Sequence, residues 1–95
     1  MLLKDIGSKY GRRKLTLFTH MLLVIIFSGV YYESLSPDDF NGGEGLKNYS
    51  DYLYFTIVTH ASVGYGDISP KTKKAKILVS THIVLAFVFI ISLWI

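Results

Sequence analysis

The chain has 95 residues, of which 51% are hydrophobic, 18% are charged and none is cysteine. This length allows one domain at most, and the low charge content excludes an ordinary disordered chain. The absence of cysteine excludes a disulfide-stapled secreted scaffold and any metal site built on thiolates.

The net charge of +3 hides a segmented charge pattern. Residues 1–14 carry a net +4, residues 33–50 a net −3 and residues 71–76 a net +4. The stretches 15–32 and 77–95, of 18 and 19 residues, carry no Lys, Arg, Asp or Glu. As helices they would be about 27–29 Å long, which matches the hydrocarbon core of a bilayer.

The two uncharged stretches therefore predict transmembrane helices. A soluble bundle is disfavoured, because a chain this short cannot bury two helices that are apolar on all sides. A signal peptide is an alternative for the first stretch, with Ser34 and Ser36 near a cleavage site, although such peptides use an apolar run of roughly 7–15 residues. The basic residues flank the spans as interfacial anchors, so we expect a lipid bilayer and no nucleic acid as partner.

The first segment, residues 1–14, is basic and weakly amphipathic. Leu2, Ile6 and Tyr10 recur every four residues among basic side chains, which is typical of a helix on a membrane surface. Gly7 and Gly11 weaken that pattern, so a disordered basic tail stays an alternative. This segment and the central loops each contain five Lys or Arg, so the positive-inside rule does not orient the chain.

Residues 33–50 are predicted to form a polar loop between the spans, with turns at Pro37 and at the Gly42–Gly43 pair. If several copies gathered, its carboxylates could form an outer rim that concentrates cations. The alternative is an ordinary solvated loop. The residues of this acidic rim are Glu33, Asp38, Asp39 and Glu44.

Residues 51–61 are predicted to form a short apolar helix of about three turns, too short to span a bilayer. Ser50 is the expected N-cap, and Asp51 suits the positive end of the helix dipole. The negative end of the dipole, near residues 59–61, would favour a cation if several copies aimed it at a shared cavity. A second polar loop, residues 68–76, leads into the second span.

Between helix and loop lies Ser-Val-Gly-Tyr-Gly-Asp, residues 62–67. Two glycines separated by one residue admit backbone conformations closed to other residues, and alternation of these can turn successive carbonyl oxygens to one side. Several copies around an axis would stack rings of oxygens that replace the hydration shell of a monovalent cation. Val63 and Tyr65 are expected to pack against the short helix. Because two spans enclose no lumen, this function requires several chains, and four suit such a ring.

Three histidines accompany these elements. For His20 and His82, inside the spans, we expect neutral rings that hydrogen-bond to a neighbouring helix. His60 is expected to pack behind residues 62–67, with proton modulation as the alternative. Their spacing is not that of a metal site.

Residues 62–67 resemble the selectivity filter of potassium channels, and the layout resembles their two-span class. The wider string from Tyr54-Phe55 through Thr59-His60-Ala61 to Asp67-Ile68, with Pro70-Lys71-Thr72 and His82-Ile83-Val84, is similar to the miniature potassium channels of large algal viruses. The resemblance covers the chain from about Leu15 to its C-terminal end.

This resemblance implies an all-α membrane protein in which two transmembrane helices flank a pore helix and a filter strand. It implies a homotetramer that passes K⁺, the only metal ion involved, with no cofactor and no small-molecule substrate. The K⁺ ligands would be the carbonyls of Ser62, Val63, Gly64 and Tyr65, with the Ser62 hydroxyl. The residues that would support the filter are Gly66, Asp67, Tyr54, Phe55, Thr59 and His60.

The resemblance also implies an orientation. Asp67 and the acidic rim should face outside, with both termini in the cytoplasm, in a host plasma membrane or an internal virion membrane.

The sequence departs from the family pattern around the filter. Many relatives have tryptophans at the positions of Tyr54 and Phe55, and glutamate at the position of Val58. Tyr54 can still hydrogen-bond to Asp67, but Phe55 and Val58 offer no polar group. We therefore hypothesise that the filter is less firmly held and contributes to gating.

Two alternatives to a K⁺-selective channel stay open: a poorly selective cation pore, and a small membrane adaptor that does not conduct. The sequence contains no Ser/His/Asp set, carboxylate pair or phosphate-binding loop, so an enzyme is not expected. Two stripes of the second span could face a cavity, one through Ser80 and Val84 and the other through Thr81 and Leu85.

Overall fold

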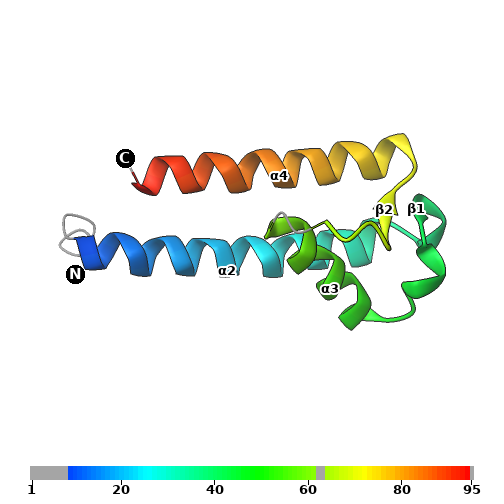
Figure 1. The fold of residues 1–95 in the computed structure, drawn as a ribbon. Coiled ribbons are helices and arrows are strands. Elements are labelled where there is room, and N and C mark those ends of the chain that lie inside the picture. Colours follow the sequence, from blue (N-terminus) through cyan, green and yellow to red (C-terminus); the bar gives the residue numbers. More distant parts are fainter. Residues whose placement is uncertain (1–8, 62–63, 95) are drawn as a thin grey trace.

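The structure is a computed structural model that describes residues 9–61 and 64–94. Two long helices lie side by side, and a region of short elements connects them at one end (Figure 1). In chain order the elements are α2 (Lys9–Ser34), η1 (Pro37–Asp39), β1 (Phe40–Asn41), η2 (Gly43–Gly45), α3 (Tyr49–His60), β2 (Ser69–Pro70) and α4 (Lys73–Trp94).

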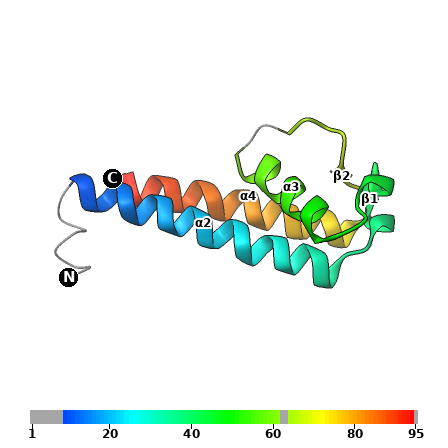
Figure 2. The same cartoon turned by 90° about the horizontal axis from the view of Figure 1, so that it is seen from below.

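The long helices α2 and α4 run antiparallel, so the two ends of the described chain lie together at one end of the molecule (Figures 1 and 2). The short helix α3 packs near the opposite end against both of them. The molecule is elongated, 46 × 21 × 21 Å. At 1.5 Å per residue the 26 residues of α2 extend about 39 Å, more than a hydrocarbon core requires.

Both long helices contain a stretch long and apolar enough to cross a membrane, Arg13–Ser34 and Lys73–Ile91. Only 22% of each stretch is buried, whereas the core helix of a soluble protein is mostly buried. Leu17, Phe18 and Ile25 of α2 are more than half exposed, as are Val84 and Ile91 of α4. The predicted helical fold with two candidate spans is confirmed.

The helices extend beyond the predicted spans at their loop ends. Glu33 and Ser34, predicted as loop, form the last turn of α2, because no helix breaker occurs before Pro37. The lysines at the start of α4, also predicted as loop, lie in its first turn. Thr72 caps that turn, since its hydroxyl accepts the backbone N–H of Ala75 at 3.3 Å. At the other end, residues 9–14 continue directly into the span as part of α2.

The helix α3 begins at Tyr49, two residues earlier than predicted, and Asn48 is its N-cap. The prediction of Ser50 as the cap is wrong. Asp51 stands three residues after Asn48, where its carboxylate accepts the backbone N–H of Asn48 at 3.1 Å and that of Lys47 at 2.9 Å. This reciprocal capping fixes the start of the helix.

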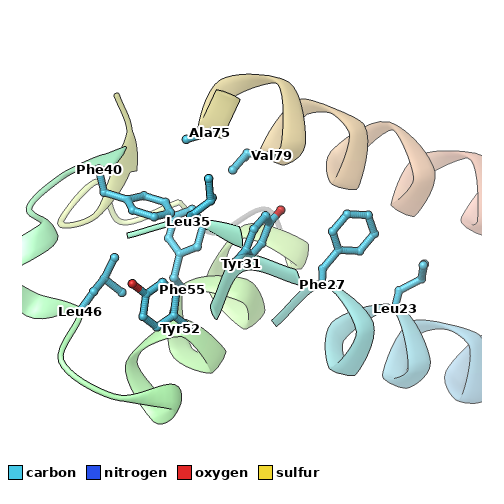
Figure 3. Close-up of a cluster of buried hydrophobic side chains, with 10 residues drawn as sticks. All are labelled: Leu23, Phe27, Tyr31, Leu35, Phe40, Leu46, Tyr52, Phe55, Ala75 and Val79. Carbon is cyan, nitrogen blue, oxygen red and sulfur yellow. The ribbon is translucent and has the colours of Figure 1, made fainter. Parts of the chain in front are cut away.

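A cluster of buried side chains joins the three helices at the loop end (Figure 3). The ring of Phe55 on α3 meets Tyr31 of α2 at a centroid distance of 5.7 Å and Phe40 of β1 at 5.1 Å, both edge-to-face. These contacts hold α3 in place. The cluster consists of Leu23, Phe27, Tyr31, Leu35, Phe40, Leu46, Tyr52, Phe55, Ala75 and Val79.

The strands β1 and β2 form a two-residue antiparallel ladder with Phe40 opposite Pro70. Asp39, just before β1, strengthens this connection, because its carbonyl accepts the backbone N–H of Lys71 at 2.8 Å. The polar loop between α2 and α3 is thereby joined to the segment that follows Gly64 and Gly66.

Candidate functional site

The segment from Gly64 to Asp67 connects α3 to β2 (Figure 2). Gly64 has φ 56° and Gly66 has φ 84°, so both occupy the left-handed region that favours glycine. Conformations closed to most other residues, as expected of these two glycines, are therefore present on either side of Tyr65. Ser62 and Val63, two of the expected K⁺ ligands, lie outside the described residues.

Asp67, at the C-terminal end of this segment, is bonded to α3. Its carboxylate accepts the hydroxyl hydrogen of Tyr54 at 2.8 Å and the backbone N–H of Ile68 at 3.0 Å. The predicted bond between Tyr54 and Asp67 is confirmed. This hydrogen bond to a carboxylate raises the pKa of Tyr54 above its ordinary value.

A hollow of about 490 Å³ lies between this segment, α3 and the first half of α4. Phe55 and Thr59 line it from α3, and Ser80 and Ile83 line it from α4. Ser80 belongs to the first of the two stripes considered for the second span. An added Cβ at Gly64 or Gly66 would meet no atom within 4 Å, so glycine is required there by backbone conformation alone.

The side chain of Tyr65 differs from its prediction. It is 70% exposed, so within one chain it does not pack against α3. Such exposure of an aromatic ring beside an unfilled hollow leaves both surfaces available to another molecule.

Among the expected supporting residues, Phe55 is 4% exposed and belongs to the buried cluster. Thr59 lines the hollow together with Gly64 and Gly66. His60, the last residue of α3, hydrogen-bonds to both spans.

The three histidines form a hydrogen-bonded row. His60 Nε2 is 2.8 Å from His20 Nδ1, and His60 Nδ1 is 2.9 Å from His82 Nε2. His82 Nδ1 is 2.9 Å from the hydroxyl of Tyr31. His82 and Tyr31 are fully buried. The prediction that His20 and His82 hydrogen-bond to a neighbouring helix is confirmed. Nothing in the sequence indicates that the three rings meet.

The acidic rim lies at the loop end, on the last turn of α2 and on η1 and η2. The carboxylate of Asp39 accepts the backbone N–H of Ser36 at 2.9 Å and the hydroxyl hydrogen of Thr72 at 2.6 Å. These bonds lower the pKa of Asp39 below its ordinary value. Glu33 lines a surface hollow together with Lys74, so part of the negative charge is offset.

Sequence reasoning missed two polar contacts that hold these elements together. Asp39 fastens the outer loop to the start of α4 through Thr72, a residue whose place just before a helix is typical of a cap. Ser28 of α2 lies 2.6 Å from the hydroxyl of Tyr49 at the start of α3. A serine inside an apolar span was the only signal of the second contact.

Comparisons with known proteins agree with this geometry. A model of the ion channel family matches residues 19–94. Potassium channel protein kcv of Paramecium bursaria Chlorella virus 1 is 32% identical over 90% of this chain and 96% of its own length. Two-pore potassium channel 4 of Arabidopsis thaliana is 46% identical over 67% of this chain, but only 24% of its own length.

Potassium channel K2 of Plasmodium falciparum is 33% identical over 74% of this chain and 5% of its own length. No solved structure matches the chain. Ion channels are membrane proteins, not enzymes, and need no cofactor. From the family model and the viral relative, which the chain covers almost completely, we conclude that this chain belongs to the ion channel family.

Proposed function

We propose that this protein is a K⁺-selective channel that conducts passively through a filter of backbone carbonyls. The observation that carries the proposal is the left-handed backbone at both Gly64 and Gly66. In our proposal the carbonyl oxygens of Ser62, Val63, Gly64 and Tyr65 and the Ser62 hydroxyl coordinate the ion. The potassium channels among its relatives support this choice of ion.

The proposed working unit is a homotetramer. One chain leaves Tyr65 exposed, leaves the hollow beside Gly64 and Gly66 unfilled, and exposes apolar residues along both spans. In an assembly, Tyr65 of one chain could fill the hollow of a second copy. Irregular backbone at membrane depth is tolerated only where protein encloses it or where it lines a watery path, and four copies would provide both.

Two features of the chain would favour a cation in such an assembly. The C-terminal end of α3 carries the negative end of its dipole and lies directly before the filter. The acidic rim lies at the same end of the molecule as Asp67, because β1, next to Asp39, pairs with β2, and a Cβ on Gly42 would stand 1.9 Å from the Asp67 carbonyl oxygen. We propose that this end faces outside and that both termini lie in the cytoplasm, in a host plasma membrane or an internal virion membrane.

Purified protein in a planar bilayer with opposed K⁺ and Na⁺ gradients tests the proposal. The expected reversal potential is close to the K⁺ equilibrium value. A value near the nonselective point would instead indicate a poorly selective cation pore, and silence would indicate a non-conducting adaptor.

Two glycine-to-alanine variants, one at Gly64 and a control at Gly45, make this test more specific. Gly64→Ala should abolish conduction or selectivity, because alanine is disfavoured at φ 56°. Gly45→Ala is the matched control, since an added Cβ there meets only the Ile68 side chain, at 3.8 Å. Equal K⁺ selectivity in the two variants would contradict a filter built on Gly64.

A further inference from the structure

The last residue of α3, His60, uses both of its ring nitrogens to bridge the two spans. Nε2 bonds to His20 of α2 at 2.8 Å, and Nδ1 bonds to His82 of α4 at 2.9 Å. His82 in turn bonds back to Tyr31 of α2 at 2.9 Å. We call the four side chains His20, His60, His82 and Tyr31 the histidine row. It links all three helices at the point where α3 ends and the filter segment begins.

The hydrogens of the row can be counted. Three neutral imidazoles supply one N–H each and the phenol supplies one O–H, while the row contains three bonds. If Tyr31 donates to His82, every bond is filled and the remaining hydrogen is on His20 Nε2. If instead His20 donates to His60, His60 to His82 and His82 to Tyr31, the remaining hydrogen is on the Tyr31 hydroxyl. His20 Nε2 is buried and has no hydrogen-bond partner among the described residues, so it is an open end of the row.

If a bond of His60 in the histidine row breaks, water cannot replace the lost partner at His82. His82 is fully buried, so water does not reach its ring. A buried nitrogen that loses its partner retains the full cost of its desolvation. The distances of 2.8 and 2.9 Å are near the lower end of the ordinary range, which ends at about 3.2 Å. A shift of α4 relative to α2 by about half an ångström would therefore break one of the two bonds or pull His60 along.

We propose that His60 is a positioning residue that transmits the relative position of the two spans to the start of the filter. This inference rests on the proposed channel function, because its consequence is measured as gating. Only Ala61 separates His60 from the expected ligand Ser62 along the chain. A displacement of the ring would therefore reach the filter within two residues.

A pure packing role is the competing explanation, since the ring of Phe27 stacks on His82 at a centroid distance of 4.3 Å. Substitutions with amide side chains distinguish the packing role from the positioning role. In His60→Asn the amide reaches the position of Nδ1, so the bond to His82 is kept and that to His20 is lost. In His60→Gln the amide reaches the position of Nε2, and the reverse holds. His60→Leu loses both bonds but keeps an apolar side chain of similar size.

The first measurement is single-channel recording of these variants in planar bilayers. We expect His60→Leu to change the ratio of open to closed time by about tenfold or more, as the loss of a buried hydrogen bond implies. His60→Asn should stay closer to the wild type, because it keeps the link to α4. Tyr31→Phe should shift gating in the same direction as His60→Leu. Tyr32→Phe, on the neighbouring residue with no hydroxyl contact in the described structure, is the matched control.

The second measurement does not depend on conduction. In ¹⁵N-histidine-labelled tetramer in nanodiscs, magnetic resonance should detect two couplings across N–H···N bonds between imidazoles. His60→Asn and His60→Leu should each lose both couplings, because His60 is a partner in each bond. Absent couplings in the wild-type protein overturn the bridge. Present couplings with unchanged gating in His60→Leu overturn the positioning role. A silent wild-type protein with both couplings supports the bridge and refutes the proposed channel function.

Discussion

Gly42 allows the polar loop after α2 to approach Asp67, at the end of the proposed filter, and Gly42→Ala tests that role. Gly42 has φ 74° and lies at the start of η2. A Cβ added there would stand 1.9 Å from the carbonyl oxygen of Asp67, the residue that closes the filter segment. Ordinary contact begins at 3.4 Å, so one of the two backbones has to move by about 1.5 Å.

The cost of this change has two parts. Holding alanine in the left-handed region costs about 1–2 kcal/mol. Overpacking against backbone, which cannot rotate away as a side chain does, adds about 1–3 kcal/mol. We therefore expect Gly42→Ala to destabilise each chain by about 2–5 kcal/mol, or to move Asp67 and loosen its bond to Tyr54.

Two measurements on purified protein check this reasoning, the melting temperature in detergent and the current in K⁺ and Na⁺ gradients. Gly42→Ala should lower the melting temperature by several degrees and weaken K⁺ selectivity. Gly45→Ala, in the same loop, should change neither, because its Cβ would meet only a side chain at ordinary distance. Equal behaviour of the two alanine variants would refute the contact between Gly42 and Asp67.

Three further predictions concern single contacts. Tyr54→Phe removes the hydroxyl bonded to Asp67, so single-channel records should show shorter filter openings at unchanged expression; unaltered open times would count against this bond as a filter support. Asp39 has a pKa lowered by its bonds to Ser36 and Thr72, so its stabilisation is present above its unfolded pKa and is lost as the pH falls through its lower folded value. Melting temperatures should therefore fall below about pH 4 in the wild type and less steeply in Asp39→Asn; identical slopes would contradict this linkage. Phe55→Trp should destabilise the fold by about 1–3 kcal/mol, because Phe55 is 4% exposed within the aromatic cluster, and an unchanged melting temperature would disprove tight packing there.

The spans could be predicted from the sequence because the absence of charge over a bilayer's length is a property of composition alone. Their ends could not, because these depend on single caps and breakers. Pro37 ends α2 later than the charge of Glu33 suggests, and Thr72 starts α4 ahead of the apolar run. The start of α3 could have been predicted, since Asn48 followed three residues later by Asp51 is a capping pattern.

The backbone of the filter segment was also predictable, because glycine at positions 64 and 66 permits conformations that other residues avoid. The contact between Tyr54 and Asp67 was expected from the family resemblance, since Tyr54 stands where many relatives have tryptophan. The histidine row was not expected, because its bonds join side chains 40 and 22 residues apart on three helices, and their alignment depends on how those helices pack.

The exposure of Tyr65, which was predicted to pack against the short helix, has a different cause. It concerns which parts of the structure one chain completes by itself. Each chain fixes its own α3, through the buried ring of Phe55, the bond from Tyr54 to Asp67 and the bridge at His60. The segment that follows α3 is less complete, because a hollow of about 490 Å³ lies between it, α3 and α4.

There, Tyr65 is 70% exposed, and Gly64 and Gly66 face open space. Irregular backbone at membrane depth is tolerated only where protein encloses it or where it lines a watery path, and the proposed tetramer would provide this for the segment. The prediction that Tyr65 packs against a short helix is therefore not met within one chain. In the proposed tetramer, the helix that receives Tyr65 would belong to a neighbouring copy.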